Sequence, residues 1–379
     1  MKKKTYVFLY FFSVVIVIFL LSDLILSKYT NLFEIRKDCF EYIKINKGNK
    51  DFYTYNLKKN CFAFEHKGRT PSYKVFTNDE GHRFSNNQIK KSDDKVIFLG
   101  DSFTYGFGVN YDQSITGQIS KKVGNKYDIL NFGVPGYSPS INFFKLKEYI
   151  KRNKNIKVSK IFYLLDITDV HDESNRWMNI SGIDQPVIIN ENINKEIIKE
   201  FSIKGSFRTS RFLAYIINNN LRNLKKKIIT LFTPKQNIID NKGTYWGSFT
   251  HTSQEDLYKD IKFSNLWKNN YEIGLDLIKE KIIGISKLSR NLNAEFYIVI
   301  HPWKESIELG QKEFNWVKYS NQLCSLSKCT KLINFFDEVE KIKDNNLDWK
   351  RKLYFYKDVH FNEVGNKLYA EKIFTEAFK

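Results

Sequence analysis

Short apolar segments that end in glycine or polar residues recur along this chain and restrict the folds open to it. The clearest is Val96–Leu99, a continuous apolar run that stops at Gly100, as expected of a strand buried on both faces. The other predicted strands are Ile129–Phe132, Ile161–Leu165, Phe296–Ile300 and Lys331–Asn334. Helical patterns alternate with them, so the chain is predicted to be α/β, a three-layer sandwich with a roughly five-stranded parallel sheet between helices.

One helix is well marked ahead of the fourth predicted strand. Apolar residues recur there at helical spacing and predict a single buried stripe. They are Ile273, Leu277, Ile278, Ile282, Ile285 and Leu288.

Asp101 and Ser102 follow the first apolar run directly, at the carboxyl end of a predicted parallel strand. Ligands of open parallel sheets gather at this end, and α/β enzymes place serine nucleophiles there. The other interpretation is a helix cap, because Ser and Asp are both preferred at helix N-termini. These residues alone leave both interpretations open.

Asp358 and His360 stand just before the helical pattern that closes the chain. A serine nucleophile needs a base, and the base needs a carboxylate to orient it. Two residues apart in a loop, the side chains can converge if the backbone turns between them, and His360 is then expected within hydrogen-bond reach of both Ser102 and Asp358. The alternative is a helix start capped by Asn362, with a surface histidine.

These segments, in this order, resemble the GDSL or SGNH hydrolase family. The resemblance rests on G-D-S at 100–102, D-x-H at 358–360, and I-L-N-F-G-V-P-G-Y-S at 129–138, which is similar to the family's second block. It implies a flavodoxin-like SGNH fold. It also implies roles for four residues: Ser102 as nucleophile and backbone oxyanion donor, Gly133 as a second backbone donor, Asp358 as orienting carboxylate and His360 as general base.

The resemblance extends from about Val75 to the C-terminus. The segment V-F-T-N-D-E-G-H-R at 75–83 is similar to the hairpin that precedes G-D-S in membrane-anchored members.

The family's third block, G-x-N-D, is altered in this chain. The third predicted strand is followed by D-I-T-D at 166–169, with Thr168 at the position of the asparagine whose side chain is an oxyanion donor in the family. A threonine hydroxyl donates one hydrogen bond, reaches less far than an amide, and can turn away to accept. Either Thr168 completes the oxyanion site, or the donor comes from elsewhere, or catalysis is weak.

The same stretch offers a competing cation site, because Asp166, Asp169, His171 and Asp172 lie within seven residues. Carboxylates and imidazole at such spacing can hold a divalent cation. Acidic residues at a strand end also cap helices or pair with cations such as Arg176, and this second interpretation is preferred, so no metal and no cofactor are predicted. His301, after the fourth strand, is interpreted as a packed or hydrogen-bonded loop residue.

The amino terminus predicts a membrane anchor over residues 1–28. Lys2, Lys3 and Lys4 precede the apolar segment Tyr6–Leu21, whose length approaches a bilayer span of about 20 residues. A cleaved signal peptide is the alternative, but no A-x-A-like site follows. By the positive-inside rule the remainder lies outside a bacterial cytoplasmic membrane, as a single-pass protein with an extracytoplasmic domain.

The four cysteines are compatible with an exported domain. They allow three connectivities, of which the sequence-local one pairs Cys39 with Cys61 and Cys324 with Cys329. An oxidising compartment permits both bridges. Four unpaired buried thiols are the alternative.

Two regions are expected after the anchor. Residues 29–92 form a membrane-proximal segment ending in the hairpin, and 93–379 form the hydrolase-like domain, with an insertion at about 172–270. Trp177, Trp246 and Trp267 lie in this insertion, which would overhang the nucleophile and is the expected source of selectivity. Each tryptophan either stacks on a sugar ring or packs the insertion onto the core.

The net charge of +19 does not indicate a nucleic-acid partner. Lys and Arg are spread along the chain, no nucleic-acid module is recognisable, and an exported domain does not meet that partner. A basic face suits an anionic bilayer or acidic glycans instead. The local run Arg222–Lys227 is interpreted as a solvated helix face, with phosphate or lipid headgroups as the alternative.

The predicted function is a membrane-anchored serine esterase. The family resemblance implies an O-acetyl group on a cell-envelope glycan as the first candidate ester. Such a glycan and the bilayer are the predicted partners, and the oligomeric state is left open. If a sugar hydroxyl replaces water, the same residues make an O-acetyltransferase. A third possibility is an inactive module that binds glycan or an assembly partner, motivated by Thr168.

Overall fold

A computed structural model of the chain describes residues 6, 10–19, 21–22, 39–65, 70–85, 92–188, 271–312, 314–356 and 358–379. The chain divides into two compact units. One comprises Met1–Lys37 and Lys195–Asp240, and the other comprises Asp38–Asn194 and Asn241–Lys379. All of the predicted site residues belong to the second unit.

The second unit is built on a five-stranded parallel sheet with the spatial order β6–β5–β7–β10–β11. The strands are β5 (Asp94–Leu99), β6 (Asp128–Asn131), β7 (Lys157–Leu165), β10 (Glu295–Ile300) and β11 (Lys331–Asn334). The predicted α/β fold with five parallel strands is therefore confirmed. In chain order the arrangement is flavodoxin-like, and its topological switch point lies between β5 and β7.

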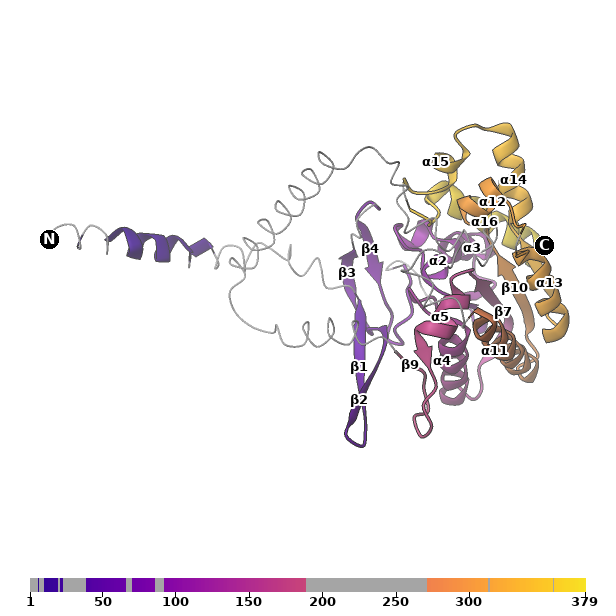
Figure 1. Ribbon diagram of the computed structural model, residues 1–379, viewed down its shortest axis with the longest axis horizontal. Coiled ribbons are helices and arrows are strands. Elements are labelled where there is room, and N and C mark those ends of the chain that lie inside the picture. The colour runs from indigo at the N-terminus through magenta and orange to yellow at the C-terminus, as the bar shows by residue number, and fades with distance from the viewer. Residues whose placement is uncertain are drawn as a thin grey trace. The chain divides into compact units, whose positions relative to one another are not determined.

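Helices cover both faces of this sheet (Figure 1). On one face α3 (Ile115–Val123) contacts α16 (Glu363–Ala377), and on the other α4 (Pro139–Arg152) contacts α11 (Tyr271–Asn291). The residues of Val96–Leu99 are fully buried between these layers. Burial on both faces explains why that strand is apolar throughout rather than alternating.

The buried stripe of α11 differs from the predicted one at its first residue. Ile278, Ile282 and Ile285 are buried, but Ile273 is 51% exposed. Gly274 takes the buried position instead, because a Cβ there would lie 2.1 Å from the carbonyl oxygen of Val170. The close approach of α5 (Asp169–Asn175) therefore sets the rotation of this helix.

Two antiparallel hairpins precede the sheet and belong to the same compact unit. The first pairs β1 (Phe40–Lys47) with β2 (Lys50–Leu57), and the second pairs β3 (Phe62–Glu65) with β4 (Tyr73–Phe76). A bridge between Thr77 and Arg83 closes the turn after β4, within the segment predicted as a hairpin.

The remaining elements are short and lie mostly at the ends of strands. They are α2 (Ser102–Tyr105), η2 (Tyr111–Gln113), β8 (Trp177–Met178), β9 (Val187–Ile188), α12 (Lys304–Leu309), α13 (Trp316–Ser327), α14 (Phe336–Asn345) and α15 (Trp349–Leu353).

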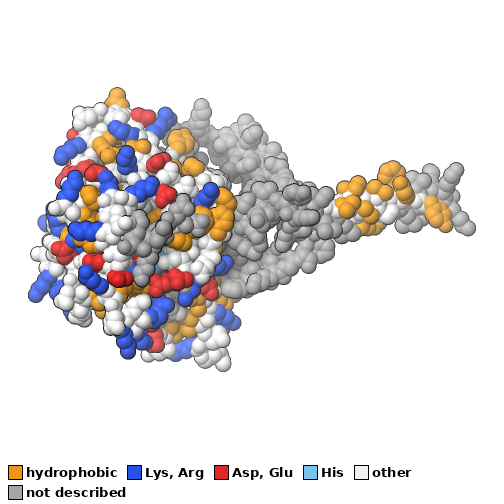
Figure 2. All heavy atoms as spheres, turned by 180° about the vertical axis from the view of Figure 1, so that it is seen from behind, with side chains coloured by type: hydrophobic (Ala, Val, Ile, Leu, Met, Phe, Trp, Pro, Cys, Tyr) orange, Lys and Arg blue, Asp and Glu red, His pale blue; other side chains and the backbone are white. Residues whose placement is uncertain are grey.

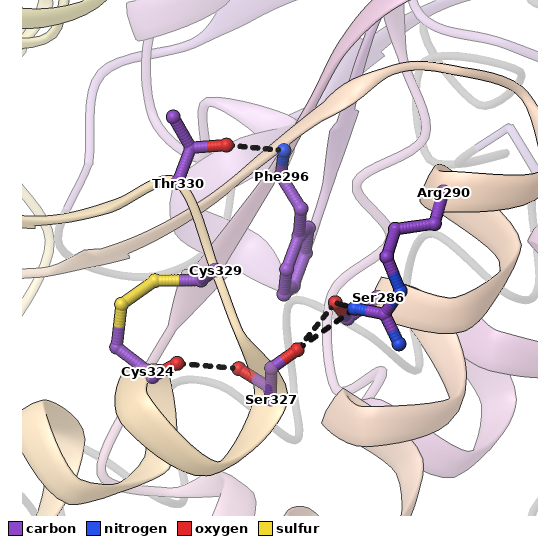
Figure 3. The surroundings of a disulfide bond; sticks show 7 residues. All are labelled: Ser286, Arg290, Phe296, Cys324, Ser327, Cys329 and Thr330. Atoms are coloured by element: carbon purple, nitrogen blue, oxygen red, sulfur yellow. Dashed lines mark hydrogen bonds between the residues drawn. A yellow bond between two sulfur atoms is a disulfide. The ribbon is translucent and has the colours of Figure 1, made fainter.

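Both sequence-local cysteine pairs form disulfides. Cys39–Cys61 joins the residue before β1 to the residue before β3, and so closes the base of the first hairpin. Cys324–Cys329 spans the C-terminal end of α13 (Figure 3).

The turn at this second disulfide is tied to the neighbouring helix and strand. The Ser327 carbonyl oxygen accepts from Ser286 Oγ at 2.7 Å and from Arg290 Nη1 at 3.0 Å. Phe296 N donates to Thr330 Oγ1 at 3.1 Å (Figure 3). Hydrogen bonds thus hold the segment between α13 and β11 to both α11 and β10.

Of the first unit the structure describes residue 6 and the helical residues 10–19 and 21–22. Within the described parts of the chain, no helix is long and apolar enough to cross a bilayer. The predicted anchor at 1–28 includes residues outside the described set, as do Arg222–Lys227, Trp246 and Trp267.

Charges are mixed on the face of the molecule in Figure 2. Among its described side chains, Lys and Arg are interspersed with Asp and Glu instead of forming one continuous basic area. The described basic side chains on this face therefore form no single basic surface.

Removing the disulfides is expected to destabilise the domain, and more so for the bridge that closes the larger loop. The bridges span sequence separations of 22 and 5 residues. Chain entropy then predicts losses of about 3 kcal/mol for Cys39→Ser with Cys61→Ser, and about 2 kcal/mol for Cys324→Ser with Cys329→Ser. Urea unfolding of the two double variants measures both, and a larger loss for the second pair would contradict the entropic account.

Candidate active site

Ser102 lies at the carboxyl end of β5, the strand between β6 and β7. Gly100 makes the exit possible with φ +148°, where an added Cβ would lie 2.3 Å from Thr104 Oγ1. Asp101 is the N-cap of α2, and its Oδ1 accepts from Phe103 N at 2.9 Å. Because Asp101 takes the capping role, the hydroxyl of Ser102 is left for another partner.

Asp358 and His360 lie in the loop between α15 and α16, which folds back on itself. A bridge joins Tyr354 to Phe361, and Phe355 N donates to the His360 carbonyl oxygen at 3.0 Å. Asn362 caps α16 as its sequence suggested. Asn362 therefore caps the helix while Asp358 and His360 converge. The two interpretations of this segment, a capped helix start and a catalytic pair, do not exclude each other.

The three side chains form one hydrogen-bonded chain. His360 Nε2 lies 2.8 Å from Ser102 Oγ, and His360 Nδ1 lies 2.6 Å from Asp358 Oδ1. Burial alone would raise the pKa of Asp358, but hydrogen bonding and charge at His360 lower it overall. The ionised carboxylate places the ring proton on Nδ1 and leaves Nε2 as an acceptor for the Ser102 hydroxyl.

A second acceptor for that hydroxyl is Asp101, whose Oδ2 lies 3.3 Å from Ser102 Oγ. Burial, and then the neighbouring charge of Asp166, raise the pKa of Asp101 well above its usual range. The contact of Ser102 Oγ to His360 Nε2 is the shorter of the two, at 2.8 Å. Distance therefore favours transfer of the Ser102 proton to His360.

Gly133 does not lie where an oxyanion donor is needed, and that prediction is wrong. Its N–H donates to Asn131 Oδ1 at 2.9 Å. Its α-carbon packs against the backbone of α2, since an added Cβ would lie 2.3 Å from Tyr105 N. The Asn131 side chain thus accepts the Gly133 N–H that the family resemblance assigned to the oxyanion.

Gly136, the second glycine of N-F-G-V-P-G, lines the cavity beside Ser102. It has φ +75°, and within the described part of the chain no acceptor takes its N–H. The N–H of Ser102 is likewise without an intrahelical acceptor, because it opens α2. Two backbone donors, Ser102 and Gly136, are therefore available to a bound oxyanion.

Thr168 lines the same cavity, but its hydroxyl donates to Asp166 Oδ2. That carboxylate also accepts from Trp303 Nε1 at 2.8 Å, and His301 Nε2 lies 3.3 Å away. Burial alone would raise the pKa of Asp166, but these contacts lower it overall. The hydroxyl has a single proton, which this ionised neighbour occupies.

The acidic cluster at 166–172 is divided among different protein partners. Asp169 Oδ2 accepts from Asp166 N at 3.2 Å, and Asp172 lies 3.2 Å from both Arg176 Nη1 and His171 Nδ1. No group of metal-ligating side chains occurs among the described residues. The pairing of Asp172 with Arg176 matches the preferred sequence interpretation.

The cavity over Ser102 and His360 has a volume of about 230 Å³. Trp303 and Val359 form apolar parts of its lining, and His171, Asp172 and Arg176 form polar parts. Trp177 is not part of this lining; it is buried, and its ring packs against that of Tyr55 with centroids 5.3 Å apart. A larger cavity of about 780 Å³ opens at the amino ends of the strands, away from this site.

Comparison with protein-family models and with curated proteins finds no match. Solved structures do show similarity. A member of the lipolytic protein G-D-S-L family from Veillonella parvula aligns at 12% identity and TM-score 0.40, over 76% of this chain and 99% of its own. The acetylxylan esterase Axe2 from Geobacillus stearothermophilus aligns at 11% and 0.37, over 76% and 96%.

The psychrotrophic esterase EstA from Pseudoalteromonas sp. aligns at 10% identity and TM-score 0.36, over 74% of this chain and 94% of its own. The likeness is one of fold and assigns no activity to this chain.

Thr168→Val tests whether the threonine hydroxyl contacts the reaction. Because its proton is held by Asp166, we expect the isosteric change to lower kcat less than about fivefold, whereas losing a true oxyanion donor costs roughly 10² to 10³. Steady-state hydrolysis of 4-nitrophenyl acetate measures the difference. A hundredfold fall with unchanged folding would return the donor role to Thr168.

Proposed function

We propose that this chain is a serine esterase of the SGNH type. The observation that carries the proposal is the hydrogen-bonded chain Ser102–His360–Asp358, with distances of 2.8 and 2.6 Å, in a cavity at the carboxyl end of the sheet. Nucleophile, base and orienting carboxylate are the groups that ester cleavage through a covalent intermediate requires.

In the proposed reaction Ser102 Oγ attacks the ester carbonyl carbon while its proton passes to His360 Nε2. The carbonyl oxygen becomes an oxyanion that accepts from the N–H groups of Ser102 and Gly136. As the carbon–oxygen bond to the alcohol breaks, His360 returns the proton to the departing oxygen. Asp358 stabilises the imidazolium between these two transfers.

The acyl-serine is then cleaved by water in the same manner. His360 removes a proton from water, the hydroxide adds to the acyl carbon, and the Ser102 oxygen recovers the proton as the acid leaves. When the attacking group is a sugar hydroxyl instead, the product is a new ester and the enzyme is an acyltransferase. Both directions use the same residues.

A short acyl group on a hydroxylated substrate fits the described cavity. Its volume of about 230 Å³ and its apolar residues Trp303 and Val359 suit an acetyl group. Asp172 contacts both Arg176 and His171, so the Arg176 charge already has a partner, a combination suited to hydroxyl groups rather than to a strong anion. An O-acetylated envelope glycan is the substrate class proposed.

The proposal places this reaction outside the cytoplasmic membrane, with residues 1–28 as the anchor. Lys2–Lys4 ahead of the apolar segment Tyr6–Leu21 support that orientation. Two disulfides in the second unit support an oxidising compartment.

Ser102→Ala is the direct test of the nucleophile. The full chain in mild detergent is expected to hydrolyse 4-nitrophenyl acetate and to react covalently with a fluorophosphonate probe. Ser102→Ala should abolish labelling and reduce kcat by about 10³ or more, because the covalent intermediate can no longer form. A folded wild-type chain showing neither turnover nor labelling would favour the inactive binding module.

The reaction products distinguish a hydrolase from an acyltransferase. With an acetyl donor and an oligosaccharide supplied together, acetylated sugar in the mass spectrum identifies a transferase. Free acetate alone, in the same time, identifies a hydrolase.

Deleting residues 2–28 tests the anchor. The full chain produced in bacteria is expected to stay with membranes through an alkaline carbonate wash and to be digested by protease added to spheroplasts, since an apolar span of this kind is not extracted. The deleted form should be lost from the membrane fraction. Release of the full chain by carbonate would contradict the proposed anchor.

A further inference from the structure

A tyrosine of the first hairpin is joined to the turn that carries Gly136. Tyr55, on β2, donates from its hydroxyl to the Pro135 carbonyl oxygen at 2.8 Å. Tyr137 donates from its own hydroxyl to the Tyr55 carbonyl oxygen at 2.5 Å. The two rings pack with centroids 5.5 Å apart, so hairpin and turn are joined by two reciprocal hydrogen bonds and a ring contact.

The position of the first bond matters because of how a peptide group is built. The Pro135 carbonyl and the Gly136 N–H belong to one planar trans peptide and point in opposite directions. Holding the carbonyl oxygen therefore fixes the direction of the N–H. A hydrogen bond to the oxygen also polarises the group and makes its N–H a stronger donor.

The next peptide is held as well. The Gly136 carbonyl oxygen accepts from Trp177 Nε1 at 2.9 Å and from Arg176 Nη1 at 3.3 Å. The guanidinium lies so close that an added Cβ on Gly136 would be 1.9 Å from Nη1. Both peptides around Gly136 are thus fixed by side-chain donors, while the N–H of this cavity-lining residue has no acceptor among the described residues.

We propose that Tyr55 is a positioning residue of the esterase reaction, which aims and polarises the Gly136 N–H by holding the Pro135 carbonyl oxygen. The inference rests on the proposed function, because it assigns the Gly136 N–H to the oxyanion. It makes the first hairpin, closed at its base by Cys39–Cys61, a working part of the site rather than a spacer.

Tyr55 remains a donor wherever the base is active. Burial is the main cause that raises the pKa of its hydroxyl above the ordinary value. Removing the hydroxyl should therefore change the height of the pH–rate profile and not its shape.

Tyr55→Phe keeps the ring and removes only the hydroxyl. We expect kcat for 4-nitrophenyl acetate to fall about tenfold, less than the roughly 10² to 10³ of losing an oxyanion donor outright, with KM changed less than about twofold. Inhibition by an aryl trifluoromethyl ketone, which adds to the serine as a tetrahedral adduct, should weaken by the factor lost from kcat/KM. Tyr137→Phe should act in the same direction, because it loosens the same turn.

Tyr319→Phe is the matched control, because the Tyr319 hydroxyl donates to the Leu275 carbonyl oxygen at 2.9 Å and neither residue lines the cavity. It should lose similar stability in urea unfolding and keep kcat. If Tyr55→Phe matches this control in kcat and in ketone inhibition, or if only KM rises, the positioning role is overturned. That result is distinct from failure of the proposed function, in which wild-type turnover would not depend on Ser102.

Discussion

The hydrogen bond between Ser102 and His360 joins residues 258 positions apart, and the site exists only where both ends of the domain are in place. Ser102 is held by β5 inside the sheet, and His360 by the loop before α16, which packs on α3. Phe103, the residue after Ser102, packs its ring against both His360 and His301, with ring centroids 4.9 and 3.9 Å apart. The apolar core and the reactive geometry therefore depend on the same packing.

The carboxyl groups behind Ser102 are arranged so that negative charge is confined. Burial raises the pKa values of Asp101 and Asp169, whereas contacts from His301, Thr168 and Trp303 lower that of Asp166 despite its burial. A raised pKa favours the neutral form of a carboxyl group, and a neutral group opposes a developing oxyanion less than an ionised one does. The ionised form is favoured at Asp166, where hydrogen-bond partners surround it.

The strands could be predicted because each is a local apolar run. Asp358 and His360 could be predicted because they form a D-x-H pair just before a helix. The choice between Gly133 and Gly136 could not, since both stand in N-F-G-V-P-G and the outcome depends on Asn131, whose side chain takes the Gly133 N–H. The contribution of Tyr55 leaves no local signal either, because its partner lies 80 residues away. Such hydrogen-bond partners depend on how the folded chain packs, and the sequence of a single segment does not determine them.

Because the Thr168 hydroxyl is already engaged, the proposed oxyanion site depends on backbone donors. A side-chain amide can adjust its rotamer to meet an oxyanion, but a backbone N–H points only where its peptide plane points. With the Thr168 proton held by Asp166, the direction of the Gly136 peptide decides how well charge is stabilised. Hydrogen bonds on both carbonyls flanking Gly136 supply that direction, and one comes from the N-terminal hairpin. His360 and Asp358 are thus positioned by the C-terminal loop before α16. The turn that carries Gly136 is positioned by the N-terminal hairpin, and Ser102 lies between the two.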